Sequence, residues 1–418
     1  MELRDRPSPP SLDRARIAGF AERAAGGAVI YALPLIMAVA NKSALAIVCI
    51  AAALCLIAGW LRRGSLVKVI RSLVPPFSIE FALVLAFVGF AILSLIWSVD
   101  RLQTAYGLGE ALLAFGAGSV IAASLTASSQ ANVMWHLRIA ITLTAALILS
   151  ELVFGMPIRR LMGMRMETAQ YNKTLEVLIM LAAPLIASLL GAQRNIQSWL
   201  TIGFLAIAAF VSDSGSSALG IIVAVATMLM ALRHPALVRR IGLSIALLLL
   251  VAAPFLGASF NYLTPKRVES ALNSMHIAER VEIWRAYGHV VANYGATGTG
   301  FATSAAVTAA GFLDDAPDDI RALQATHPHN IFLQIWVELG IVGALIAGAL
   351  IWRVFARIAA QPRDQQQMSL TFIATASTIA LISHGAWLGW LIASYSAAFA
   401  LILLLWRSPP SSDQTTSA

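Results

Sequence analysis

The stretch HPHNIFLQIWVELGIVGALIAGALI, residues 327–351, decides the fold class of this chain. After its first four residues it is predominantly apolar, and it is long enough to cross a bilayer as one helix. The whole chain of 418 residues has the same character, with 59% hydrophobic residues, 12% charged residues and a mean hydropathy of +0.78. A soluble domain of this size needs more charge to cover its surface. The sequence therefore predicts an all-α polytopic membrane protein.

About twelve apolar segments are expected to cross the membrane. They lie near residues 25–41, 43–60, 79–97, 106–125, 136–154, 174–190, 198–212, 217–232, 241–258, 330–351, 368–386 and 388–406. The chain then divides into a tail (1–24), nine spans (25–257), a long loop (258–329), three spans (330–406) and a second tail (407–418). Most of the 29 Lys and Arg fall on the side of the N-terminus, so the positive-inside rule places both tails in the cytoplasm.

Most of the remaining basic residues gather in two loops on the outer side. They are Arg159, Arg160, Arg165 and Lys173 in one loop, and Lys266, Arg267, Arg280, Arg285 and Arg321 in the other. An anionic ligand at the outer face would account for cations that run against the orientation rule. The alternative is that a long loop is translocated regardless of its charge.

Part of the long loop is predicted to be helical. In HIAERVEIWRAYGHVVANY, residues 276–294, apolar side chains recur at helical spacing and cover one face. Arg280 projects from the middle of that face, where a guanidinium is costly unless an anion or an acceptor meets it. We therefore predict that Arg280 contacts a ligand, with a structural salt bridge as the alternative. Arg285 and His289 project from the opposite side beside Glu282, so Arg285 either contacts substrate or is solvated or paired with Glu282.

Two further motifs of the long loop favour turns over binding sites. The glycines of NYGATGTGFATS, residues 293–304, would let backbone N–H groups approach a phosphate, but their spacing matches no known phosphate-binding signature. Four carboxylates follow, at Asp314, Asp315, Asp318 and Asp319. A hard cation would accept such ligands, but acidic residues around a proline more often form a solvated turn. We predict no metal site and no cofactor.

The histidines precede the tenth span at the outer interface. The positive end of the helix dipole disfavours imidazolium at His329, so its ring is expected to be neutral, which is the state of a general base. The alternative is an interfacial histidine that caps the helix. His327 is a candidate substrate contact in the same loop.

A polar stripe continues from the histidines into the tenth span, formed by Asn330, Gln334 and Glu338. These side chains are expected to face a cavity or other helices, and they are also candidate substrate contacts.

At these residues a family resemblance becomes visible. RVEIWRAYGHVVANYGATGTGF (280–301) and HPHNIFLQIWVELGIVGAL (327–345) resemble the paired signature of the bacterial O-antigen ligase and O-antigen polymerase superfamily. In that signature an Arg-x-x-x-Trp helix leads to a Gly-rich turn, and a His-Asn block opens the next membrane helix. ILSLIWSVDRLQTAYGLGEAL (92–112) and YNKTLEVLIMLAAPL (171–185) are similar to two further family segments.

The resemblance implies a membrane glycosyltransferase of the GT-C type, with its active site on the periplasmic side of the bacterial inner membrane. Such an enzyme moves a glycan from undecaprenyl pyrophosphate to an acceptor hydroxyl without metal or nucleotide. His329 matches the proposed base, Arg280 matches a candidate pyrophosphate contact, and Lys173 falls where the family often has Arg. In-line attack would invert the anomeric carbon.

One departure from the family concerns the segment VSDSGSSALGIIVA, residues 211–224, where members commonly carry Ser-Arg and this chain has no basic residue. The candidates to replace that arginine are Ser214, Ser216, Ser217, Arg159, Arg160 and Arg165. The proline that usually precedes the Gly-rich turn is replaced by Tyr294.

The sequence is compatible with three functions. The first is a ligase that transfers a finished glycan to lipid A–core or a similar acceptor, which the histidine block favours. The second is a polymerase that joins lipid-linked repeat units. The third is a polysaccharide transporter, which we disfavour because the chain lacks the two similar halves that are typical of transporters. The expected partners are the lipid-linked donor, the acceptor glycan and membrane lipids, and no nucleic acid.

Overall fold

The computed structural model describes residues 12–74, 77–125, 130–188, 196–212, 214–255, 277–316 and 325–407. Within these ranges all regular elements are helical, and nine helical segments are long and apolar enough to span a membrane. Each of the twelve expected spans coincides with a helix. Three of those helices, however, are too short or too polar to be identified as membrane-spanning by length and hydropathy. The all-α multi-pass membrane architecture is therefore confirmed, and the count of twelve spans is not.

The first part of the bundle begins with α1 (Leu12–Gly27), which continues through a π-helical turn (Ala28–Ala32) into α2 (Leu33–Val39). It continues with α3 (Ala44–Arg63), α4 (Leu66–Leu73), α5 (Ile79–Leu93), α6 (Arg101–Ser124), α7 (Gln130–Val153) and α8 (Pro157–Leu161). The second part contains α9 (Asn172–Ser188), α10 (Ile196–Val211), α11 (Gly215–Arg233), α12 (Pro235–Ala252), α15 (Ile277–Tyr294), α17 (Ile331–Ala359), α18 (Arg363–Ile382) and α19 (Gly389–Arg407).

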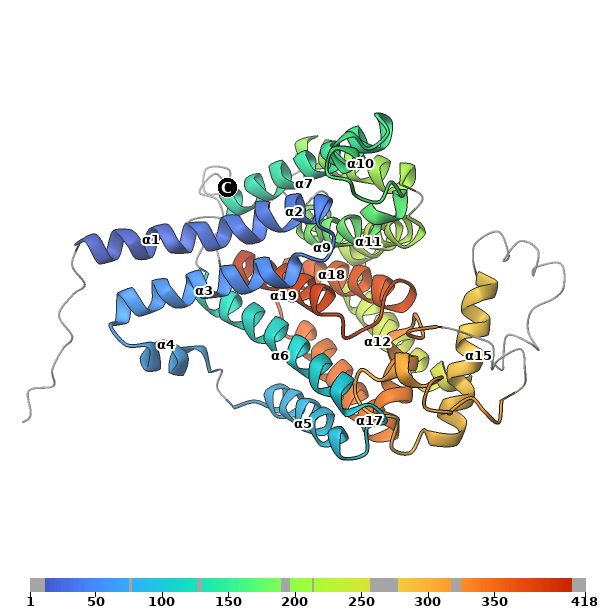
Figure 1. Ribbon diagram of the computed structural model, residues 1–418. Coiled ribbons are helices and arrows are strands. Elements are labelled where there is room, and N and C mark those ends of the chain that lie inside the picture. Colours follow the sequence, from blue (N-terminus) through green and yellow to red (C-terminus); the bar gives the residue numbers. More distant parts are fainter. Residues whose placement is uncertain are drawn as a thin grey trace, which may run out of the picture.

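Helix α9 lies at the centre of the bundle. All its side chains in the range 174–187 are buried, and α2, α7, α10, α11, α18 and α19 pack around it. A helix that is apolar on every side is stable only when other helices surround it. The short helix α4 and the loop helix α15 lie at opposite ends of the bundle (Figure 1). The first residues of α9 point toward the same end as α15, where the histidines lie.

Helix α17 is interrupted at Gly340, whose φ of 58° and ψ of −158° are not helical. The Gly-rich turn fills this interruption. Thr299 N–H donates to the Val337 carbonyl at 2.8 Å, and Gly300 N–H donates to the Glu338 carbonyl at 2.9 Å. These N–H groups are used inside the protein, so the turn interpretation holds and the phosphate-cradle alternative does not.

The close approach of the two backbones needs glycine. Gly298 has a φ of +73°, and a Cβ atom on it would overlap the backbone of Glu338. We expect Gly298→Ala to lower the free energy of unfolding by about 2 kcal/mol, because both the left-handed backbone and the contact are lost. Gly116→Ala is the matched control, since a Cβ at this helical position meets open space. Thermal unfolding in detergent measures both, and equal midpoints would show that the turn does not pack against α17.

Candidate active site

The loop that carries the two histidines is held by α15 and by the start of α17. The indole Nε1–H of Trp284 donates to the Pro328 carbonyl at 3.0 Å. The Asn330 side chain caps α17 by accepting from the N–H groups of Phe332 and Leu333 at 3.0 and 3.2 Å. Between these two anchors His329 has a φ of 49°, a left-handed conformation that is rare and costly outside glycine. The surrounding contacts therefore fix the ring of His329 in one position.

The hydrogen bond of His329 defines its tautomer. Its Nδ1 lies 2.6 Å from the carbonyl oxygen of Ser383, in the loop between α18 and α19. A carbonyl can only accept, so Nδ1 carries the proton and Nε2 of the neutral ring carries a lone pair. Burial is the largest effect that lowers the pKa of His329, and the Arg280 charge lowers it further, while the Ser383 bond raises it. His329 is thus a neutral imidazole whose basic nitrogen is Nε2.

Cations from separate parts of the chain converge on these rings. Arg280 is half-buried on α15 and lies close enough to His329 to lower its pKa. The Nζ atom of Lys173, at the start of α9, lies 5.8 Å from the centre of the Trp390 ring. The charges of Lys173 and of Lys42, from the turn between α2 and α3, both lower the pKa of His384. Positive charge from three separate parts of the chain thus acts on the histidines.

Two further imidazoles complete the cluster. The rings of His327 and His329 lie 4.0 Å apart, and burial lowers the pKa of His327 to about 4. His384 lies in the α18–α19 loop, with its Nδ1 3.5 Å from Oε2 of the completely buried Glu176. Burial, followed by the Lys173 charge, lowers the pKa of His384 to about 3. All three rings are therefore neutral at neutral pH.

His384, Glu176 and Lys42 are not among the residues predicted from the sequence. A signal for Glu176 was present, because an acidic residue within an apolar span usually marks a functional site. His384 gave no comparable signal, since it follows an ordinary apolar helix. Ser216, predicted as a candidate, donates to Oε1 of Glu176 at 2.8 Å and so reaches the site indirectly. Ser214 donates to the Ser217 hydroxyl, also at 2.8 Å.

The predicted polar stripe on α17 is satisfied within the protein. Gln334 donates to Glu338 at 2.9 Å and accepts from the Ala386 N–H at 2.8 Å. The completely buried Glu338 carboxylate accepts from Ala302 N–H, from Ser304, and from the Trp387 indole. The stripe therefore faces other segments of the protein, as expected for buried polar groups, and its contact with substrate stays a prediction. The stripe links three segments to one another: the histidine loop, the Gly-rich turn and the α18–α19 loop.

Several predicted residues lie apart from the histidines. Arg160 and Arg165 are exposed, and Arg160 donates to the Gly155 carbonyl in its own loop. Arg285 lines a different cavity of about 830 Å³ with His289, on the other side of α15. Asp314 and Asp315 are exposed, and the described part of the chain holds no cluster of metal-ligating side chains. Lys266, Arg267, Arg321, Asp318 and Asp319 lie outside the described residues.

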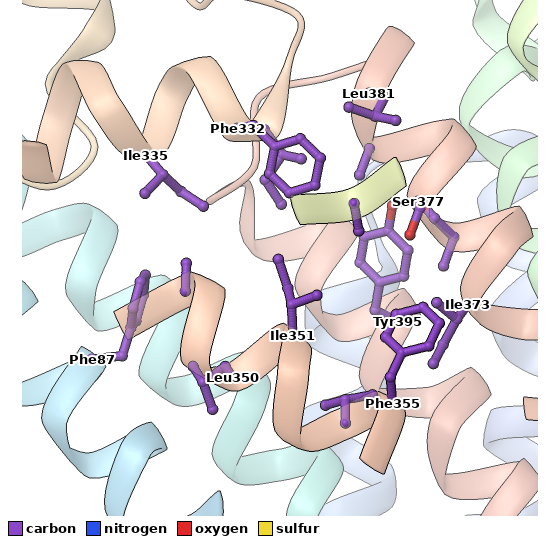
Figure 2. Close-up of a pocket in the computed structure, with 16 residues that line it drawn as sticks. Phe87, Phe332, Ile335, Leu350, Ile351, Phe355, Ile373, Ser377, Leu381 and Tyr395 are labelled. Atoms are coloured by element: carbon purple, nitrogen blue, oxygen red, sulfur yellow. Dashed lines mark hydrogen bonds between the residues drawn. The ribbon is translucent and has the colours of Figure 1, made fainter. Parts of the chain in front are cut away.

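An apolar cavity of about 390 Å³ begins close to the histidine loop. Figure 2 shows its wall, with Phe332 and Leu381 at one end and Phe355 at the other. Phe332 follows His329 by three residues, and Leu381 precedes Ser383 by two residues. Side chains from α5, α12, α17, α18 and α19 enclose it. The polar cluster and the apolar cavity are thus neighbours along two helices.

These features define a multi-pass helical membrane protein with a cation-rich site at one end of the bundle. Residues 200–348 match the family model described as O-antigen ligase, which covers somewhat more than a third of the chain. The chain therefore carries a domain of the O-antigen ligase family. A domain of this family implies a membrane enzyme of the ligase or glycosyltransferase type that acts on lipid-linked glycans. No curated protein matches the chain significantly.

The convergence of donors on Glu338 can be tested by substitution. Glu338→Gln turns one acceptor oxygen into a donor amide and leaves buried donors without a partner. We expect the free energy of unfolding to fall by about 1–3 kcal/mol, the usual penalty for an unsatisfied buried group. Glu282→Gln on exposed α15 surface should leave the thermal midpoint unchanged. If both variants unfold like the wild-type protein, Glu338 does not hold these segments together.

Proposed function

We propose that this protein is an O-antigen ligase that transfers a glycan from undecaprenyl pyrophosphate to a hydroxyl of lipid A–core or a similar acceptor. One observation carries the proposal: the Ser383 carbonyl holds the Nδ1 proton of His329 and leaves the lone pair on Nε2, in a ring that the Arg280 charge also affects. An imidazole with a fixed tautomer suits a general base, and a guanidinium suits a diphosphate. The family match over residues 200–348 supports the same class of reaction.

The transfer needs two kinds of assistance, and the cluster offers both. Nε2 of His329 takes the proton of the acceptor hydroxyl while the hydroxyl oxygen forms a bond to the anomeric carbon. The bond from that carbon to the pyrophosphate oxygen breaks, and its electron pair leaves with the pyrophosphate. Arg280 and Lys173 offset the charge that grows on this leaving group. Attack opposite to the leaving group inverts the anomeric centre, as in GT-C-type enzymes.

The apolar cavity supports a polyprenyl-linked donor. Its walls are almost entirely hydrocarbon, and it starts within one turn of the histidine loop. Part of the polyprenyl chain would occupy this cavity while the pyrophosphate lies against Arg280 and Lys173. An amphiphilic donor fits a site in which cations and apolar walls adjoin.

The charge distribution supports a periplasmic site. Helix α4 and its flanking residues carry Arg62, Arg63, Lys68 and Arg71 at the end of the bundle opposite α15 (Figure 1). The positive-inside rule assigns such a basic end to the cytoplasm. The histidines and α15 would then face the periplasm of the inner membrane, with both termini inside.

A release assay tests the proposed transfer. Purified protein given a pyrophosphate-linked glycan and an acceptor should release undecaprenyl pyrophosphate. We expect His329→Asn to lower kcat about 10²- to 10⁴-fold, since a general base is lost while asparagine tolerates the left-handed backbone. Arg280→Gln should lower kcat about 10²-fold through loss of leaving-group stabilisation. His136→Gln on α7, where His136 contacts Tyr31, serves as the control.

The pH dependence of the same assay separates the roles of these two residues. His329 must be neutral to act, and its pKa lies below the ordinary value of 6.5, so activity should fall on the acid side below pH 6.5. Removing the Arg280 charge should move this acid limb to higher pH, because that charge lowers the His329 pKa. Near-normal transfer by His329→Asn would exclude His329 as the base. An acid limb that stays in place in Arg280→Gln would show that the two groups do not interact.

A deletion strain distinguishes the ligase from the polymerase. Loss of a ligase should leave long glycans on the lipid carrier and none on the acceptor. Loss of a polymerase should leave single repeat units on the acceptor. We expect the first pattern, because the histidine block resembles ligase-type members. Gel profiles of the surface glycan together with the extracted lipid-linked fraction give the answer.

A further inference from the structure

His384 takes no direct part in the proposed transfer, although it belongs to the same cluster as the proposed base. It follows Ser383, whose carbonyl accepts from Nδ1 of His329. Its neighbour Gly385 lies against the ring of His327, which is 4.0 Å from the ring of His329. The charges of His327 and His329 both affect the pKa of His384. The three imidazoles therefore form one electrostatic unit.

His384 is the imidazole of this unit that has a carboxylate beside it. Nδ1 of His384 lies 3.5 Å from Oε2 of Glu176 and also contacts the Ser383 hydroxyl. Oε1 of Glu176 accepts from the hydroxyls of Ser216 and Ser383. Oε2 is buried without a hydrogen-bond partner and faces His384. A carboxylate behind Nδ1 orients an imidazole and stabilises its protonated form.

We propose that His384 is the proton relay of this site, receiving the proton that His329 removes from the acceptor, with Glu176 stabilising the imidazolium that results. This inference rests on the proposed function and adds the route by which the proton leaves. The proton passes from Nε2 of His329 through a water molecule to Nε2 of His384. His329 returns to its neutral state with its Nδ1 proton in place, and no other bond changes.

The surrounding charges make this relay depend on the donor. Burial and the charges of Lys173, on α9, and Lys42, in the α2–α3 turn, lower the pKa of His384 to about 3. Arg280 adds positive charge beside His329. A bound diphosphate neutralises these cations, so the pKa of His384 rises and its ring accepts a proton. When the polyprenyl pyrophosphate leaves, the pKa falls again and the proton passes to solvent.

Proton uptake tests the relay without requiring turnover. The probe is farnesyl pyrophosphate, a short polyprenyl diphosphate, titrated calorimetrically at pH 6 in buffers of different ionisation enthalpy. The wild-type protein should take up protons as the probe binds. His384→Gln and Glu176→Gln should take up at least twofold fewer. Glu176→Gln is the more conservative variant, because its amide oxygen can still accept from Ser216 and Ser383.

Steady-state kinetics give the second readout. Each single variant should lower kcat about 10-fold or more with little change in the donor KM, and the double variant should lose no more than the worse single variant, since the pair acts as a unit. In His384→Gly, added imidazole should restore part of the lost kcat. Glu80→Gln and His136→Gln are matched controls, because Glu80 pairs with Arg353 and His136 contacts Tyr31 outside this site.

The outcomes separate the relay from the proposed function. Wild-type protein that releases no polyprenyl pyrophosphate overturns the ligase proposal, whatever the variants do. If the wild-type protein is active and both variants keep the wild-type proton uptake and kcat, the relay is wrong and the ligase proposal stands. A raised donor KM at constant kcat also overturns it, because His384 would then bind phosphate. Thermal midpoints near the wild-type value show that the variants are folded. If one of His384→Gln and Glu176→Gln does not fold, the other variant provides the test.

Discussion

The carboxylate of Glu338 joins three segments that are distant in sequence. It accepts hydrogen bonds from Ala302 N–H and from the Ser304 hydroxyl and N–H in the Gly-rich region, from Gln334 on its own helix, and from the Trp387 indole. A buried charge is tolerated only when such donors surround it. Glu338 lies two residues before the interruption of α17, where the Gly-rich turn enters. The position of α15, and with it Arg280, depends on this junction.

The site that results carries an excess of positive side chains. Arg280, Lys173 and Lys42 converge on three neutral imidazoles, and Glu176 is the acidic side chain in contact with His384. The histidines stay neutral because burial and the nearby cations both disfavour their protonation. Such a site favours an anion with a large charge. The same cations that would bind a diphosphate therefore also keep the proposed base in its active form.

The family match explains only part of this assembly. Residues 200–348 include Arg280, His329, the Gly-rich turn and Glu338. Lys173 and Glu176 come from α9, before the matched segment, and His384 comes from the α18–α19 loop after it. The central position of α9, buried on every side, brings its polar first turn to the histidines. The matched domain is completed by helices from both ends of the chain.

The sequence by itself determined the membrane class, because runs of apolar residues have no other stable environment. It also placed Arg280 on the packed face of α15 and His329 at the start of α17, because helical periodicity and helix-start signals are local. Only the tertiary structure decided the roles of Gln334 and Glu338, which have hydrogen-bond partners in loops dozens of residues away. It also brought His384 to Glu176 across more than two hundred residues. Which faces of two helices meet depends on packing of the whole bundle, and no local pattern encodes it.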